Sequence, residues 1–338
     1  MPCLLSALAL WLPGLAATAA PPAPHYHLVR TIHLGGEGGW DYLFDDSRAH
    51  RLYISRGTHV AVVNTDTGRL AGDIPDTDGV HGVAIDPKSG RGFTSNGRAN
   101  TVTIFDTKTL KKIGEVSVGE GPDAIVFEPV TERVFTFNGR AGTATAIDAA
   151  SGKVAGTVTL PGRPEFPVAD GKGHLFDNIE DKSEIADVNA RTLAVDHVWP
   201  IAPGESPSGI AMDTRGRRLF SVCDGQKMAV TDADTGKVVA TPSIGNGPDA
   251  CAYDLGTHLV FSPNGQDGTM TILRQVTPDQ YETVQTLTTQ AGARTMALDE
   301  KTHHIFTVTA TALPSAPGAP RFRRSYAPGS FVVLEYAP

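Results

Sequence analysis

The sequence predicts an all-β fold, a seven-bladed β-propeller of four-stranded blades, because one unit recurs seven times in the 338 residues. Three well-matched copies begin at Gly79, Gly121 and Ser206. Spacings of 41, 42, 42, 43, 41 and 45 residues separate the equivalent positions Trp40, His81, Asp123, Glu165, Ser208, Asp249 and Arg294. Such a period is typical of propellers. Because one unit cannot bury its own faces, the seven are expected to form one ring.

The third copy shows the four strands of a blade in order. We expect them at residues 124–127, 134–137, 143–147 and 154–160. An Asn-Gly hairpin beginning at Asn138 joins the second strand to the third, since these two residue types tolerate positive φ. The turn before the outer strand recurs in phase at Asn64, Asp148 and Asp232. This repetition in phase makes the strand assignment specific.

The two ends of the chain predict how the ring closes. The seventh copy has strands near residues 295–298, 305–309 and 331–336 and then stops without an outer strand. Residues 27–34 have the outer-strand pattern. We therefore expect the N-terminal strand to complete the last blade, which leaves no open sheet edge. The propeller is expected as a single domain over residues 25–338.

The N-terminus has the pattern of an export signal. Residues 4–15 are apolar, and Ala17 and Ala19 fit an A-x-A cleavage site, which predicts a signal peptide over residues 1–19 and a periplasmic or secreted protein. The apolar run is too short for a membrane span, and no later run is long enough. A net charge of −8 argues against nucleic acid as a bulk electrostatic partner.

The repeats resemble those of the YVTN-type propellers, the YncE-like family of exported bacterial proteins. The similarity rests on the G-P-D-A starts at Gly121 and Gly247, the x-G-K-V turns at Gly152 and Gly236, and the strand ends at Asp106 and Asp148, and it extends to the Pro-rich tail at residues 328–334. It covers almost the whole chain, although the YVTN tetrapeptide is absent. Such a resemblance implies the fold but not the function, because propellers carry many functions.

A ligand site is expected at one mouth of the central channel, where the loops into the inner strands and the hairpins after the second strands share a face. Its expected residues are Trp40, His81, Asp123, Glu165, Asp249, Arg294 and Arg323. The hairpins add Arg56, Asn96, Asn138, Asn178, Asp224 and Asn264. We expect a polar ligand with an anionic group paired to Arg294 or Arg323 and a ring stacked on Trp40. Because they are exposed, these residues are expected to contribute little to folding. The alternative is an ordinary solvated mouth lined by turn-forming residues.

An insertion in the last repeat is expected from the topology to lie over the same mouth. Between Thr311 and Gly329 it contains the basic and aromatic residues Arg321, Phe322, Arg323, Arg324 and Tyr326. We interpret it as a lid or as a docking strip for an anionic group. Single-stranded nucleic acid is a weaker alternative, since it requires such a strip, and a loop without a role is another.

The site chemistry favours a binding or scaffold protein over an enzyme. We expect no metal or cofactor, a small polar molecule or a protein as the partner, and a monomer. The rival is a calcium-dependent lactonase-like hydrolase with Asp123, Glu165 and Asp249 as ligands, or a lyase using His81 and Glu165. No G-x-S-x-G motif occurs, and Ser208 has no base in its own loop. Cys223 and Cys251 are expected on adjacent blades, either as a disulfide or as two thiols.

Overall fold

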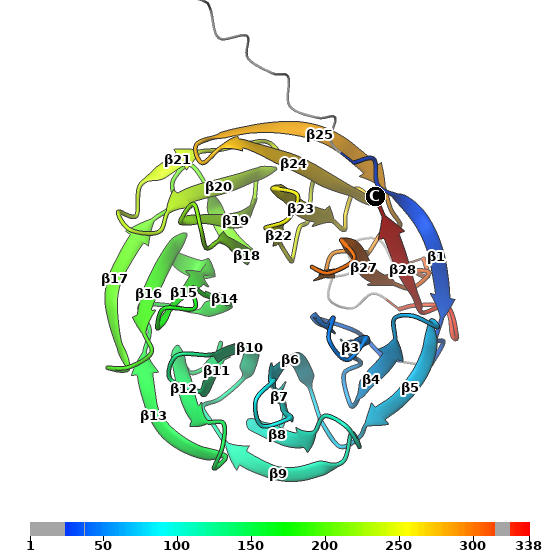
Figure 1. The fold of residues 1–338 in the computed structure, drawn as a ribbon, viewed down its shortest axis with the longest axis vertical. Coiled ribbons are helices and arrows are strands. Elements are labelled where there is room, and N and C mark those ends of the chain that lie inside the picture. The colour runs from blue at the N-terminus through cyan, green and yellow to red at the C-terminus, as the bar shows by residue number, and fades with distance from the viewer. Residues whose placement is uncertain (1–23, 37, 315–324) are drawn as a thin grey trace, which may run out of the picture.

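Seven antiparallel sheets of four strands stand around one axis (Figure 1), as seen in a computed structural model that describes residues 24–338 except 37 and 315–324. Helix within the described residues is limited to the short η1 (Glu180–Lys182). The prediction of an all-β seven-bladed propeller is confirmed. The expected signal peptide over residues 1–19 lies outside the described residues.

Each of the first six blades uses four consecutive strands, which run from the axis to the rim. The first three blades are β2 (Leu43–Asp46), β3 (Arg51–Ser55), β4 (Val60–Asn64) and β5 (Arg69–Ile74); β6 (Val80–Asp86), β7 (Arg91–Asn96), β8 (Thr101–Asp106) and β9 (Lys112–Ser117); β10 (Pro122–Glu128), β11 (Arg133–Asn138), β12 (Thr143–Asp148) and β13 (Lys153–Thr159). The next three are β14 (Pro164–Ala169), β15 (His174–Ile179), β16 (Glu184–Asn189) and β17 (Ala194–Pro200); β18 (Glu205–Asp213), β19 (Arg218–Asp224), β20 (Lys227–Asp232) and β21 (Val238–Ala240); β22 (Ala252–Asp254), β23 (Leu259–Asn264), β24 (Thr269–Thr277) and β25 (Gln280–Thr288).

The seventh blade joins the two ends of the chain, as predicted. It contains β26 (Met296–Asp299), β27 (His304–Thr309), β28 (Val332–Ala337) and β1 (His27–His33). In the antiparallel register, Thr31 pairs with Leu334 and His33 with Val332. Arg30 of β1 also forms an ion pair with Glu335 at 2.5 Å, and His304 of β27 contacts the same carboxylate at 2.7 Å. Closure is therefore fixed by both the backbone ladder and a shared buried carboxylate.

An acidic residue begins the first turn of every blade in the same way. Its carboxylate accepts a hydrogen bond from the backbone N–H two residues later and, in all but two blades, three residues later as well, which fixes the start of the turn. The seven acids are Asp46, Asp86, Glu128, Asp170, Asp213, Asp254 and Asp299. This bond sets where each inner strand ends and therefore which residue lies at its start.

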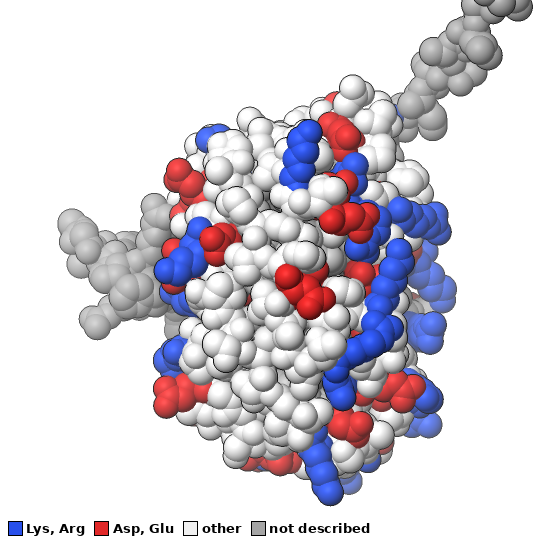
Figure 2. Space-filling view, turned by 90° about the vertical axis from the view of Figure 1, so that its left-hand side faces the viewer, with Lys and Arg blue, Asp and Glu red and all other residues white. Residues whose placement is uncertain are grey.

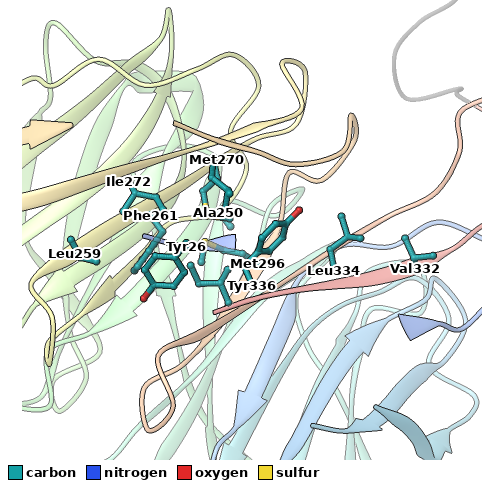
Figure 3. Packing of buried hydrophobic residues seen from close by; sticks show 12 residues of the cluster. Tyr26, Ala250, Leu259, Phe261, Met270, Ile272, Met296, Val332, Leu334 and Tyr336 are labelled. Carbon is teal, nitrogen blue, oxygen red and sulfur yellow. The ribbon is translucent and has the colours of Figure 1, made fainter. Parts of the chain in front are cut away.

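The core consists of side chains packed between neighbouring blades. Figure 3 shows the cluster between the sixth and seventh blades, where Phe261 and Met270 meet Met296 and Leu334. Tyr26, which precedes β1, is fully buried in this cluster. The sequence predicted the closing strand but not this contact, which ties the N-terminal segment to the sixth blade as well as to the seventh.

The rim of the ring is solvated. In the side view of Figure 2, acidic and basic side chains are interspersed among uncharged ones, with Lys and Arg more frequent toward the right-hand edge. Within the described residues, no helix has the length and apolar character that a membrane crossing requires.

Replacing Tyr26 tests its role in closure. Its ring lies edge-on to Phe261 with 5.2 Å between centroids, and its hydroxyl donates to the carbonyl of His303 at 3.1 Å. Its backbone N–H and carbonyl both bond the side-chain amide of Gln285. Tyr26→Ala leaves a cavity and should lower the free energy of unfolding by about 3–5 kcal/mol in denaturant titrations. The exposed neighbour Val29 is the control, and a loss in Val29→Ala as large as in Tyr26→Ala would contradict this role.

Candidate functional site

The predicted mouth contains a cavity of about 980 Å³. The hairpin after the second strand lies beside the loop into the inner strand, as shown by the bond from Gly139 N–H to the carbonyl of Gly121 at 2.8 Å. Four of the predicted site residues line the cavity, namely Trp40, Glu165, Asp249 and Arg294. Further lining residues are Glu180, Ser206, Ser208, Asp224, Tyr326 and Phe331. His81 and Asp123 are not in this lining but join it through ion pairs.

The residue equivalent to His81 in the first blade is Asp41, not Trp40. Counting five residues back from each turn acid gives Asp41, His81, Asp123, Glu165, Ser208, Asp249 and Arg294. The interval from Asp46 to Asp86 is 40 residues, one fewer than the 41 obtained from Trp40. The turn acids are visible in the sequence, so aligning the copies on them would have identified Asp41.

The mouth side chains form a chain of alternating charge across five blades. Arg294 Nε lies 2.5 Å from Asp249 Oδ2, and its Nη2 lies 3.5 Å from Asp41 Oδ1. Asp41 Oδ2 then lies 2.5 Å from His81 Nδ1, which is 3.4 Å from Asp123 Oδ1. The chain crosses the seam between the seventh and first blades. Arg294 is therefore already neutralised by two carboxylates, and the expected pairing of Arg294 with an anionic ligand group would have to compete with them.

These ion pairs keep His81 and Arg294 charged. Burial opposes the charge on His81, but the hydrogen bond to Asp41 and the charges of Asp123 and Asp41 outweigh it and raise the pKa of His81 to about 9. Burial likewise opposes the charge on Arg294, whose pKa is nevertheless raised by Asp249 and Asp41. The mouth side chains are thus half-buried and paired, so they contribute to folding more than the sequence suggested.

In contrast to these cations, three carboxyl groups of the mouth are shifted toward their neutral form. Burial, together with Asp123 and Asp249, raises the pKa of Glu165. The pKa of Asp123 is raised by burial, an effect that His81 partly offsets. Burial also raises the pKa of Asp249, although Arg294 opposes it. The site therefore holds more carboxyl groups than its cations can keep ionised at low cost.

Two aromatic rings meet across the axis beside these acids. Tyr42, next to Asp41 in the first blade, lies edge-on to Phe166 of the fourth blade, with 4.7 Å between centroids. Burial, with Glu165 as the largest of the charged contributions, raises the pKa of Tyr42 well above its ordinary value. Sequence reasoning did not single out either ring, because their contact joins blades that are not neighbours.

The hairpin asparagines bond to neighbouring strands, mostly within their own blade. The amides of the buried Asn96, Asn138 and Asn264 each donate to two threonine hydroxyls of the next strand. Asn178 donates to the carbonyl of Ser208 in the next blade at 2.7 Å. These amides serve as internal hydrogen-bond donors, which supports the alternative that the hairpin asparagines form turns rather than contact a ligand.

An aromatic wall stands on the closing side of the cavity. Trp40 is only 6% exposed and packs on Tyr326 and Phe331, with 4.7 and 5.4 Å between ring centroids. Arg56 is buried, and the central carbon of its guanidinium lies over the ring of Phe331, 3.5 Å from the ring centroid. Tyr326 belongs to the base of the insertion, where Leu313 N–H bonds the carbonyl of Ser325. The remaining residues proposed for a lid, Arg321, Phe322, Arg323 and Arg324, lie outside the described residues.

The candidate metal ligands, the candidate nucleophile Ser208 and the two cysteines have surroundings that the sequence did not specify. Oxygen and nitrogen atoms of Asp41, His81 and Asp123 lie within 4.8 Å of one another, and the grouping contains neither Glu165 nor Asp249. Ser208 donates its hydroxyl to the carbonyl of Pro248 at 3.1 Å. Both described cysteines, Cys223 and Cys251, are free thiols, and burial raises the pKa of Cys223 to about 11.

Comparison with known proteins shows the fold. No family model and no curated protein sequence matches the chain. Similar solved structures include "Kuenenia stuttgartiensis Hydrazine Synthase" (13% identity, TM-score 0.72, covering 81% of this chain and 94% of that chain) and "Structure of U3-55K" (10%, 0.75, 93% and 99%). A third is a chain of "Crystal Structure of Mitotic Checkpoint Complex" (13%, 0.75, 99% and 99%). At such identities the likeness extends to the propeller architecture alone.

The pairing of His81 predicts a pH dependence of stability. Because its pKa rises from an unfolded value of about 6.5 to about 9 on folding, its contribution is complete below pH 6.5 and is lost as the pH rises through 9. Between pH 6 and pH 10, the free energy of unfolding of the unmodified protein should therefore fall by about 1–2 kcal/mol more than that of the His81→Gln variant, with solvent screening allowed for. Denaturant titrations across this range measure the difference, and identical pH profiles would contradict the charged pair.

Proposed function

We propose that the chain is an exported binding protein of the YncE-like type, which captures a small polar molecule in the cavity at the mouth of the ring. The observation that carries this proposal is the cavity itself. Its volume of about 980 Å³ lies near the upper end of the range for small-molecule sites. Polar side chains from separate blades, including Glu165, Asp249 and Arg294, converge on it beside the aromatic wall.

The same geometry supports ligand capture more than scaffolding alone. A scaffold would use the broad solvated surface, whereas here buried carboxyl groups surround a hollow that is open to solvent. Keeping such groups out of water costs stability. Natural proteins accept this cost at functional sites. Export is proposed on the apolar run at residues 4–15, the small residues after it and the family resemblance.

A blocking substitution tests the cavity. Gly39 lines it, and a Cβ built at this position has nothing within 4 Å. Gly39→Trp should therefore fill the hollow without straining the fold. Small molecules that a thermal-shift and calorimetric screen finds to bind the protein should lose at least about tenfold in affinity for this variant, since the indole occupies their place.

The matched control is Val130→Trp. Val130 is 43% exposed and lies in the first turn of the third blade, on the face opposite the mouth. This variant should bind every hit as the unmodified protein does. Full retention of binding by Gly39→Trp, with its melting temperature unchanged, would show that the hits bind elsewhere and would reject the proposed site.

A metal-dependent hydrolase acting on lactones, or a lyase, is the second candidate. The grouping of Asp41, His81 and Asp123 favours it, because two carboxylates and an imidazole suit a divalent cation. His81 Nδ1 would have to release the proton it shares with Asp41 before it could bind the ion. Metal analysis of the purified protein tests this candidate, which requires about one ion per chain and its loss in Asp41→Asn.

A further inference from the structure

We propose that the ligand captured in the mouth cavity carries an organic ammonium group and that the carboxylate of Glu165 binds it, with Asp224 adding negative charge on the same wall. This inference rests on the proposed function and specifies the chemical class of its ligand.

The cavity wall has more carboxylates than cations. Its acidic residues are Glu165, Glu180, Asp224 and Asp249, and its basic residue is Arg294. Arg294 pairs with Asp249 at 2.5 Å, and Glu180 has its own partner in Arg163 at 2.5 Å. Among the described residues, Glu165 and Asp224 have no cationic partner. A ligand cation would supply what the wall lacks.

The groups behind the wall do not remove this excess. Asp41 and Asp123 add two carboxylates, and His81 adds one cation between them. Asp177, fully buried behind Glu165, adds a further carboxyl group, and Arg56, buried over Phe331, adds a further cation. Around the cavity, seven carboxyl groups therefore face four cationic side chains, Arg56, Arg163, His81 and Arg294. Burial raises the pKa of Asp177 well above its ordinary value. Even with Glu165 and Asp177 both protonated, five carboxylates face these four cations. An anionic ligand would meet like charge on most sides, which is costly inside a hollow of low dielectric.

In the free protein a proton takes the place of the missing cation. Burial is the main cause that raises the pKa of Glu165 to about 10, and Asp123, Asp249, Glu180 and Asp41 contribute after it. Glu165 is thus neutral at pH 7 in the absence of ligand. An ammonium group beside it would restore the carboxylate and release the proton to solvent. Binding should therefore be coupled to proton release.

The surroundings of Glu165 favour an organic cation over a metal ion. The grouping near the site that could hold a metal contains Asp41, His81 and Asp123 but not Glu165. A metal ion needs several ligands around it, whereas one carboxylate is enough for an ammonium group. The cavity is also far larger than an ion, and Trp40, Tyr326 and Phe331 offer a face for the hydrocarbon part of the ligand.

Three probes that share a phenylethyl or benzyl frame separate charge from shape. Isothermal titration calorimetry on the full chain would compare phenethylamine, 2-phenylethanol and phenylacetate, which are cationic, neutral and anionic at pH 7.5. We expect the amine to bind at least about tenfold more tightly than the alcohol, and the acid most weakly. Titrations in buffers of different ionisation enthalpy should show about one proton released per amine bound. Amine affinity should rise from pH 6 to pH 9.

Glu165→Gln tests the residue itself. Because Glu165 is neutral in the free protein, the amide should fold equally well, and its melting temperature checks this. We expect the preference for amine over alcohol to fall at least fivefold and the proton release to disappear. Glu132→Gln is the matched control, since Glu132 pairs with Lys88 in an exposed turn away from the cavity. This variant should leave the amine preference and the proton release unchanged.

The outcomes separate this inference from the proposed function. No binding of phenethylamine at millimolar concentration, or binding no tighter than that of the alcohol, overturns the cationic ligand. An unchanged preference for the amine in Glu165→Gln also overturns it. So does binding of calcium ions, added as calcium chloride, that displaces the amine from the unmodified protein and is absent in Glu165→Gln. The blocking effect of Gly39→Trp on neutral or anionic hits would still uphold the proposed function. Loss of that blocking effect rejects the site as a whole.

Discussion

The pairing of β1 with β28 is the interaction on which the rest of this structure depends. It supplies the outer strand of the seventh blade, and it sets the seventh blade against the first. At this seam Thr295 donates its hydroxyl to the carbonyl of Asp41 at 2.8 Å, and Arg294 reaches the carbonyl of Trp40 at 3.3 Å. The ion pair between Arg294 and Asp41, which links the two ends of the charged chain at the mouth, therefore exists only in the closed ring, since it joins residues 253 positions apart.

Carboxyl groups have two distinct roles in this ring, and their surroundings distinguish them. Among the turn acids, Asp299 accepts hydrogen bonds from nearby N–H and hydroxyl groups, and these outweigh burial and lower its pKa. Glu165 represents the mouth acids, where burial without enough donors raises the pKa. Asp299 therefore stabilises its blade above acidic pH, whereas Glu165 costs stability when it is ionised. A ligand that neutralises Glu165 would recover part of that cost.

The two roles follow from the repeat. The turn acid must be present in each blade because it fixes the same turn seven times. The residue five positions earlier points to the mouth, where no repeated turn constrains it, so it varies from Asp41 and His81 to Ser208 and Arg294. The ring thus presents a uniform frame with one variable side chain per blade at a shared site, an arrangement suited to recognition of an asymmetric molecule.

The sequence by itself determined the period, the four strands of each blade, the closing strand and the face on which the mouth cavity lies, because these follow from local hydrophobic pattern and turn chemistry. It could not distinguish Trp40 from Asp41 when the copies were aligned without their turn acids, and it gave no sign of the burial of Tyr26 or the contact of Tyr42 with Phe166. It also could not show that Arg294 is already paired while Glu165 is not. These features were decided by the tertiary structure, since each depends on side chains from different blades meeting in a hollow of low dielectric, where distance and desolvation, rather than sequence spacing, set the energy.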